Sequence, residues 1–219
     1  AALEAKLDDL VDLGITAIEL LPLADFKGTR NWGYDGVLPY APDAAYGRPE
    51  ELKHLIDAAH AKGLMVLIDC VYNHFGPAGN YLHAYAESFV TGRHQTPWGA
   101  GINFDGRESG RVVRGNFIEN ALYWLEEYHF DGIRFDAVHA ILDASEKHFI
   151  GELAETIRAR LPGRHIHLIL ENEANQARSL ARAGEGRPIP HSAHWADDLP
   201  PSSHVLLRGG DAAHSSSVW

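Results

Sequence analysis

Cysteine and long apolar runs are nearly absent from this sequence. Cys70 is the single cysteine among 219 residues, so no internal disulfide can form, and its place in the apolar run LMVLIDCV predicts a buried, unreactive thiol. No run of about 18 apolar residues occurs, which argues against a membrane-spanning helix. The N-terminal AALEAKLDDL lacks the basic and apolar regions of a signal peptide. We therefore expect a protein of the reducing cytoplasm with no membrane partner.

Positive charge is also scarce. The chain has 19 lysines and arginines against 30 aspartates and glutamates, a formal net charge of -11. Because nucleic-acid binding normally needs a basic face, the sequence predicts no nucleic-acid partner and leaves neutral ligands open. The 14 histidines include no HExxH spacing and there is no second cysteine, so no metal site is predicted. His165 and His167 share a strand face without a third ligand nearby, and we interpret them as ordinary strand residues.

What the chain does contain is a regular alternation of amphipathic helices and apolar strands. Helices are expected over 3–13, from Pro49 to Gly63, over 117–125, and from an Asp143–Glu146 capping pair to Pro162; the strands that follow them are expected over 15–23, 64–74, 130–136 and 165–171. Strands that are apolar on both faces favour a parallel sheet covered by helices. The predicted fold class is therefore α/β, a partial (β/α)8 TIM barrel, with a doubly wound sheet as the alternative.

Two further features bear on this fold. No GxGxxG or GxxxxGK[ST] loop follows the first strands, which argues against a dinucleotide-binding version of the doubly wound sheet. Residues 75–115 are rich in glycine, histidine and aromatic residues and are too long for an ordinary strand-to-helix loop. We interpret this segment as an insertion that rises above the sheet.

Polar residues gather where the predicted strands end. They are Asp69, Asn73 and His74 on one strand, Arg134, Asp136 and His139 on the next, and Glu171 and Glu173 on the one after. The carboxyl ends of parallel strands meet at one end of a barrel, which is where barrel enzymes build their active sites. Three such clusters in register therefore predict a catalytic site.

Two carboxylates among these residues fit the cleavage of a glycosidic bond. Asp136 shares a strand face with Arg134, and a neighbouring cation is expected to lower its pKa and keep it ionised, as a nucleophile or electrostatic stabiliser requires. Glu171 follows the apolar HLIL, a surrounding that favours the protonated carboxyl of a general acid, and Glu173 is its rival. Two carboxylates about 5 Å apart on adjacent strands suit a glycosidase that retains configuration.

The segments that carry these residues resemble a known family. DCVYNH (69–74), GIRFDAVH (132–139) and the glutamate of LILENE look like three of the four signature segments of the α-amylase superfamily of glycoside hydrolases. NWGYDGVLPYAP and HQTPWGAGINFDG, which lie between the signatures, look most like the maltooligosyltrehalose trehalohydrolase branch. The resemblance is close over roughly residues 5 to 180.

The resemblance implies a role for each site residue. Asp136 would be the nucleophile, Glu171 the general acid and base, and Arg134 would orient the nucleophile. The sugar at the cleavage point would be hydrogen-bonded by Asp69, His74 and His139 and would stack on Tyr34. The implied reaction is hydrolysis of the α-1,4 bond next to the trehalose end of maltooligosyl trehalose, by a double displacement that needs no cofactor and no metal.

The sequence also departs from the family pattern. No NHD segment, which would supply the third carboxylate, follows Glu171; the DD at 197–198 is followed by two prolines, and the tail at 200–219 looks unlike the family. We expect residues 1–219 to form an incomplete catalytic barrel, about its second to its fifth or sixth strand, that is poorly stable and inactive alone. The alternatives are an α-amylase or a glucan-branching enzyme of the same superfamily, or a noncatalytic carbohydrate-binding remnant.

Overall fold

A parallel sheet of five strands forms the centre of the molecule. The structure, a computed structural model, describes residues 2–172 and 191–195. The strands are β1 (Ala17–Leu20), β4 (Met65–Cys70), β7 (Gly132–Phe135), β8 (His167–Glu171) and β9 (Ala193–Trp195). They lie side by side in the order β1-β4-β7-β8-β9, each pair parallel. Each of these strands therefore lies next to the one that follows it along the chain, which is how a (β/α) barrel winds.

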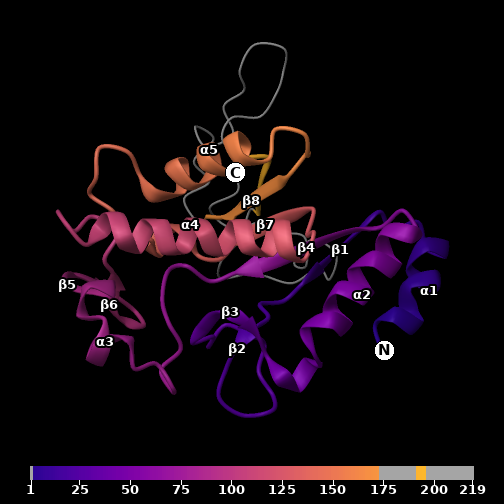
Figure 1. Cartoon of the computed structure of the whole chain (residues 1–219), viewed down its shortest axis with the longest axis horizontal. Coiled ribbons are helices and arrows are strands. Elements are labelled where there is room, and N and C mark those ends of the chain that lie inside the picture. The colour runs from indigo at the N-terminus through magenta and orange to yellow at the C-terminus, as the bar shows by residue number, and fades with distance from the viewer. Residues whose placement is uncertain (1, 173–190, 196–219) are drawn as a thin grey trace, which may run out of the picture.

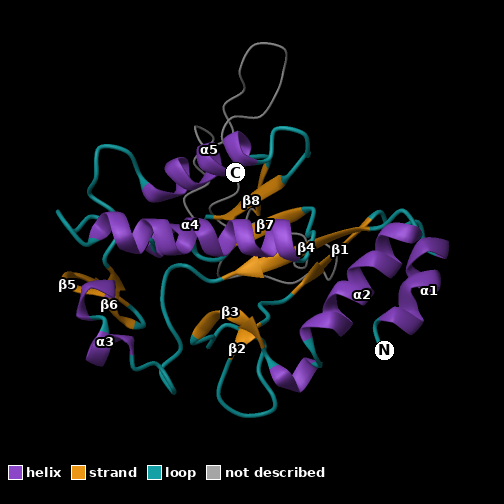
Figure 2. Cartoon of the chain, viewed as in Figure 1, coloured by secondary structure: helices purple, strands orange, loops and turns teal. Residues whose placement is uncertain are grey.

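The helices cover one face of this sheet (Figures 1 and 2). They are α1 (Leu7–Asp12), α2 (Pro49–Ala61), α4 (Gly110–Glu127) and α5 (Phe149–Arg160). The core joins Ile68 and Phe135 of the strands to Phe117 of α4 and Phe149 of α5. Buried residues of all four helices belong to this same core. A doubly wound sheet carries helices on both faces, so the arrangement is a partial α/β barrel, as predicted, and not the alternative.

The predicted elements form with shifted bounds. The helix expected over 3–13 is a 3₁₀ turn at Glu4–Lys6 followed by α1, and the strand expected over 15–23 shortens to β1. The predicted start of the fourth helix at Asp143 was wrong, because α5 begins at Phe149 with the ring of His148 capping the N–H of Ile150 at 3.3 Å.

Asp143 has a different role from the predicted helix cap. Its side chain is fully buried and pairs with Nη1 of Arg114 at 2.7 Å. It also accepts hydrogen bonds from the backbone N–H groups of Ser145, at 2.9 Å, and Phe149, at 2.6 Å. These contacts hold the pKa of Asp143 below its ordinary value against the opposing effect of burial. Asp143 therefore links the loop before α5 to Arg114 of α4 and does not begin the helix.

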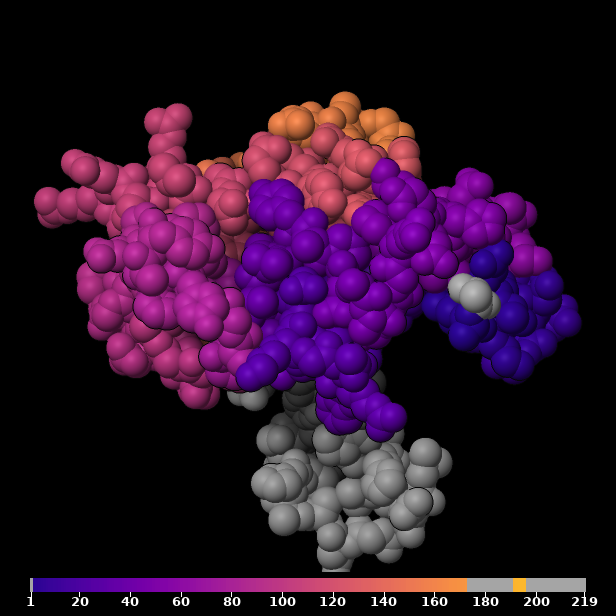
Figure 3. All heavy atoms as spheres, turned by 60° about the horizontal axis from the view of Figure 1, so that its bottom comes forward, coloured from indigo at the N-terminus to yellow at the C-terminus, as the bar shows by residue number. Residues whose placement is uncertain are grey.

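Two antiparallel pairs stand outside the central sheet. One is β2 (Ala24–Asp25) with β3 (Leu38–Pro42), followed by a 3₁₀ turn at Ala44–Tyr46. The other, β5 (Val90–Thr96) with β6 (Gly99–Ile102), follows α3 (Leu82–Tyr85) and a 3₁₀ turn at Glu87–Phe89. This second pair lies within the segment interpreted as an insertion, the last residues of which belong to α4. Figure 3 shows α3 through β6 as a lobe at one side of the molecule.

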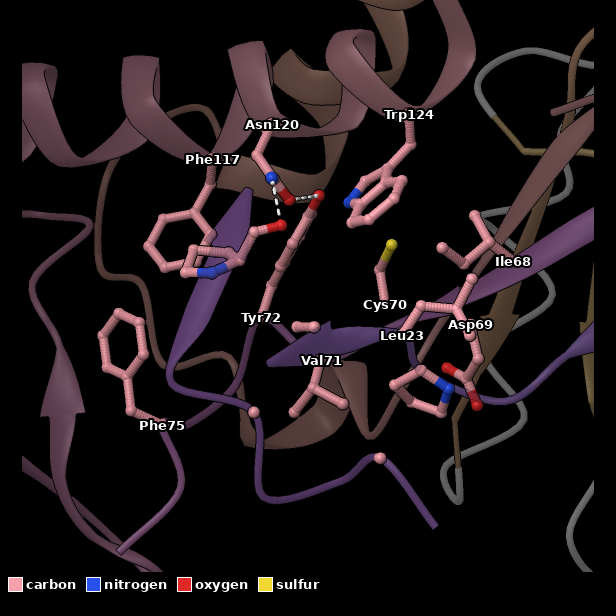
Figure 4. A pocket seen from close by; sticks show the side chains of 15 residues that line it. Leu23, Ile68, Asp69, Cys70, Val71, Tyr72, Phe75, Phe117, Asn120 and Trp124 are labelled. Atoms are coloured by element: carbon pink, nitrogen blue, oxygen red, sulfur yellow. Dashed lines mark hydrogen bonds between the residues drawn. The ribbon is translucent and has the colours of Figure 1, made fainter. Parts of the chain in front are cut away.

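Side chains alternate between the two faces of β4. Cys70 points toward Trp124 of α4, whereas Asp69 points away from that helix (Figure 4). Cys70 is buried, as predicted, and burial raises the pKa of its thiol. A small cavity of about 30 Å³ is lined by residues of both β4 and α4. The apolar packing is thus on the helical face, and the opposite face is left for charged residues. No helix in residues 2–172 or 191–195 has the length and apolar character needed to cross a membrane.

Candidate active site

Charged side chains gather on the sheet face turned away from the helices. Asp69 of β4 is paired in register with Arg134 of β7, and Glu171 ends β8 beside Trp195 of β9. Asp136 follows β7 directly, and its N–H donates to the carbonyl of Cys70 at 3.0 Å. In a parallel sheet, paired residues and residues two apart share a face. The strands therefore bring Asp69, Arg134, Asp136 and Glu171 together at their carboxyl ends.

Arg134 is the centre of this cluster. Its Nη1 contacts Oδ2 of Asp69 and lies 3.0 Å from Oδ1 of Asp136, and its Nη2 lies 2.9 Å from Oε2 of Glu171. The guanidinium is almost fully buried, with the side chain 5% exposed. One cation thus binds three carboxylates, whereas the sequence predicted a single pair.

Glu171 is fixed by the backbone as well. The N–H of Ala137 donates to its Oε2 at 2.7 Å. Ala137 has a φ of 42°, in the left-handed region that residues other than glycine seldom adopt. Such strain often accompanies functional sites, where the surrounding contacts hold it in place. Here the strained turn points the N–H of Ala137, the residue after Asp136, toward the carboxylate of Glu171.

Tyr34 and His74 extend the cluster on the side of β4. The hydroxyl of Tyr34 donates to Oδ2 of Asp69 at 2.7 Å, and Nε2 of His74 lies 3.0 Å from the carbonyl of Tyr34. Gly76 makes this approach possible, because a Cβ there would stand 1.9 Å from the carbonyl oxygen of Asp35. Burial lowers the pKa of His74. Two loops distant in sequence therefore meet at Asp69.

His139 has a different environment from the other predicted residues. It lies on the 3₁₀ turn Val138–Ala140 that follows Asp136. Its side chain is exposed, whereas Asp69, His74 and Arg134 are buried. Its exposure leaves His139 accessible to a molecule that approaches from solvent.

The charge state of Asp136 differs from the sequence prediction. Arg134 does favour its ionised form, but burial together with the neighbouring Asp69 and Glu171 outweighs that effect and raises the pKa of Asp136 to about 7. Burial likewise raises the pKa of Asp69 to about 6. The prediction of a lowered pKa was wrong because it counted one cation on the same strand and neither the burial of Asp136 nor the carboxylates on neighbouring strands.

Comparison with known proteins identifies the family. Residues 2–97 match the catalytic domain of the alpha amylases. A malto-oligosyltrehalose trehalohydrolase from Deinococcus radiodurans is 46% identical over 93% of this chain, and one from Mycobacterium tuberculosis is 44% identical over 95%. The chain belongs to the α-amylase family. It spans about a third of the length of these curated relatives, 32% and 36% respectively.

Solved structures of the α-amylase family agree with the fold. A Salmonella typhimurium protein assigned as an alpha amylase has a TM-score of 0.92 and 44% identity, over 99% of this chain and 37% of its own. An alpha-amylase from Geobacillus thermoleovorans, complexed with acarbose, has a TM-score of 0.73 at 23% identity, over 93% of this chain and 46% of its own. The second likeness shows the shared barrel fold alone.

Three residues of this candidate site were not singled out from the sequence. Trp98, in the turn between β5 and β6, stacks on His74 with ring centroids 4.6 Å apart and planes 7° apart. Trp195 lies with its ring centroid 4.7 Å from Cζ of Arg134. Glu19 of β1 is half-buried, and burial together with Asp69 raises its pKa to about 7. Trp98 stands in the quoted HQTPWGAG segment, and that aromatic among polar residues was the available signal.

Some expectations about the α-amylase-type site lie beyond what the structure places. Glu173, the rival of Glu171, the DD at 197–198 and the tail at 200–219 are outside the described residues. Within the described part of the chain, no group of three or more histidine, cysteine, aspartate or glutamate side chains is arranged to hold a metal ion. The carboxylates of the cluster converge on Arg134 instead.

Proposed function

We propose that this protein is a glycoside hydrolase that cleaves the α-1,4 bond next to the trehalose end of maltooligosyl trehalose and releases trehalose. The observation that carries the proposal is the single guanidinium of Arg134 joining Asp136 and Glu171 at the ends of adjacent strands. The relatives at 40–46% identity are named malto-oligosyltrehalose trehalohydrolases, which supports this substrate over other α-glucans.

In the first step, Glu171 would protonate the glycosidic oxygen while a carboxylate oxygen of Asp136 attacks the anomeric carbon. The bond from that carbon to the leaving oxygen breaks, and an ester bond to Asp136 forms. Carboxyls this close cannot both ionise easily, and Glu171 raises the pKa of Asp136 through its charge and a side-chain hydrogen bond. The pair is therefore suited to hold one proton, which the acid step consumes.

In the second step, Glu171 would take a proton from water, whose oxygen attacks the anomeric carbon and releases Asp136. The N–H of Ala137, 2.7 Å from Glu171, and Nη2 of Arg134 would keep this carboxylate in place through both steps. No cofactor enters the proposed sequence, since acid, base and nucleophile all come from the protein.

The remaining residues of the site would bind the sugar. Asp69 has one carboxylate oxygen, Oδ1, that is buried without a hydrogen-bond partner, so it can accept from a sugar hydroxyl. His74 likewise has its Nδ1 unpaired, and Tyr34 can offer its ring to an apolar face of the pyranose. His139, exposed on its turn, would reach another hydroxyl.

The test uses product analysis with maltooligosyl trehalose, on this protein and on a chimera. In the chimera this chain replaces the matching third of the Deinococcus radiodurans relative. Glu171→Gln and Asp136→Asn are expected to lower trehalose release by at least about 10²–10⁴-fold. Glu155→Gln, an exposed glutamate on α5, is the matched control and should leave the rate unchanged.

Other products would assign a different function. Glucose and maltose released from starch, with no trehalose from maltooligosyl trehalose, would indicate an α-amylase, and new branch points in linear glucan would indicate a branching enzyme. The branching-enzyme comparison rests on a match to a Jannaschia glucan branching enzyme, 44% identical over 59% of this chain and 19% of its own length. Sugar binding without hydrolysis by the chimera would support a noncatalytic binding protein and contradict the proposal.

A further inference from the structure

The ring of Trp195 lies against the guanidinium of Arg134. Its ring centroid lies 4.7 Å from Cζ of Arg134. Trp195 ends β9 and is paired in register with Glu171, so its side chain extends on the same face of the sheet as the charged cluster. Trp195 is 49% exposed, whereas Arg134 is only 4% exposed. The buried guanidinium therefore lies next to a partly exposed ring.

The carboxylates hold the guanidinium only at its edge. Asp69, Asp136 and Glu171 all bind the two Nη groups, and Nε is buried without a hydrogen-bond partner. A planar cation held through one edge can still tilt about that edge, and rotation about its Cζ–Nε bond is opposed only by the contacts of its Nη groups. An aromatic ring against the flat face opposes both motions, because cation–π attraction depends on the cation lying over the ring.

We propose that Trp195 is a positioning residue, which keeps the guanidinium of Arg134 oriented so that Asp69, Asp136 and Glu171 are held together. The inference deepens the proposed function, since it assigns the residue that orders the proposed nucleophile and acid through Arg134. In this role Trp195 does not act directly on Asp136 or Glu171. Its effect on the site is transmitted by the arginine.

The guanidinium can be observed directly, without any turnover. In ¹⁵N-labelled protein, the Nη resonances of Arg134, assigned by Arg134→Lys, report how fast the group rotates about Cζ–Nε. The ring of Trp195 is expected to shift the guanidinium protons upfield, and the rotation should be slow. Trp195→Leu should abolish the shift and speed rotation about two- to fivefold, the rate equivalent of an exposed cation–π contact. Trp195→Phe keeps an aromatic ring and should retain most of both effects.

A control variant removes an exposed aromatic ring elsewhere. Tyr85 on α3 is 73% exposed, and Tyr85→Leu should leave the Arg134 resonances unchanged. If Trp195→Leu does not fold, Trp195→Met replaces it, and the upfield shift in the unmodified protein remains measurable without either variant. An Arg134 resonance with no ring-current shift, or with the same rotation rate in the wild type and the Leu variant, would overturn the proposal.

Turnover supplies a second readout that a merely structural role would not move. In the chimera, Trp195→Leu should lower kcat for trehalose release about two- to fivefold with KM nearly unchanged, and Trp195→Phe should restore it. A change in KM alone would place Trp195 in substrate binding and contradict the positioning role. If the wild-type chimera releases no trehalose, the proposed function fails while the arginine resonances still decide the role of Trp195.

Discussion

Asp136 lies in surroundings that oppose the charge its proposed role requires. Attack on a sugar needs an ionised carboxylate, yet burial and two neighbouring carboxylates raise the pKa of Asp136 to about 7. The contacts to Arg134 and Glu171 nevertheless keep the side chain in place. At neutral pH, therefore, Asp136 is ionised in only part of the molecules, and a proton stays close to Glu171, the proposed acid.

This balance predicts a pH dependence of the reaction. Trehalose release should fall as pH rises through about 7, because the pair of Asp136 and Glu171 then loses the proton that the acid step consumes. The measurement is kcat/KM against pH, which reports groups of the free enzyme. A rate that stays constant from mildly acidic to mildly basic pH would contradict a shared proton that is lost near pH 7.

The same shift predicts an effect on stability. A carboxyl whose pKa is raised in the folded state favours folding while it is protonated, and that contribution is lost as pH rises from its ordinary value through about 7. Asn cannot ionise, so Asp136→Asn should unfold at higher urea concentration than the wild type at mildly basic pH. The difference should shrink at acidic pH. Asp57→Asn, at an exposed position on α2, is the control, and an equal difference at both pH values would contradict the explanation.

At the scale of elements, β7 and β8 pack so closely at Gly132 that there is no room for a side chain at this position. A Cβ at Gly132 would lie 2.5 Å from the carbonyl oxygen of His167 and 2.7 Å from its Cβ. Gly132→Ala should therefore destabilise the fold by about 1–3 kcal/mol, measured by urea denaturation. Gly151→Ala in α5 is the matched control: nothing lies within 4 Å of its Cβ position, so it should be neutral or stabilising. Equal effects of the two changes would contradict this account.

The lobe formed by α3, β5 and β6 depends on one buried carboxylate. Asp105, whose side chain is 4% exposed, accepts from Nη2 of Arg93 at 2.6 Å and contacts Nε2 of His94 at 2.7 Å. It also accepts from the N–H of Ala144, in the loop before α5, at 3.2 Å. Asp105→Asn removes the charge from these bonds and should speed tryptic cleavage after Arg93 about tenfold.

Glu87→Gln, an exposed change in the same lobe, is the control for that experiment and should leave the cleavage rate unaltered. Faster cleavage in both variants would mean that the lobe responds to any loss of charge. Because Trp98 stacks on His74 from this lobe, loosening it should also weaken that contact. Fluorescence of Trp98, isolated by difference with Trp98→Phe, measures the change.

Local pattern predicted the elements better than their ends. Alternation of apolar strands and amphipathic helices was enough to predict the parallel sheet, and Asp69, Arg134, Asp136 and Glu171 were predicted to meet because parallel strands end together. The start of α5 was missed because Asp143 pairs with Arg114, 29 residues earlier. A capping pattern reads three or four neighbouring residues and cannot detect a partner on another helix.

The pKa values of the site could not be predicted from the sequence for a similar reason. The spacing of Arg134 and Asp136 showed that they share a face, but the sequence did not show that Asp69 and Glu171 bind the same guanidinium. The position of Trp195 over Arg134 depends on a strand pairing between β8 and β9 that no local pattern encodes. Contacts between strands decide pKa values, and those contacts exist only once the sheet is assembled.

At the scale of the whole molecule, the excess of acidic residues also bears on the ligand. The formal charge of -11 would repel an anionic ligand and attract a cationic one, and salt would screen both effects. A maltooligosyl trehalose is neutral. Its KM in the chimera should therefore change less than about twofold between about 0.05 and 0.5 M salt. A steep salt dependence would indicate that the site binds a charged molecule.

The sharing of Arg134 by three carboxylates also has a consequence for the evolution of the sequence. Substituting Asp69, Asp136 or Glu171 alone alters the field in which the other two ionise, so the effects of paired substitutions will not add. Double-mutant cycles among them should show large coupling energies, unlike cycles with distant surface residues. Substitutions at these three positions and at Arg134 therefore depend on one another. A change at one of them restricts the changes that evolution can accept at the others.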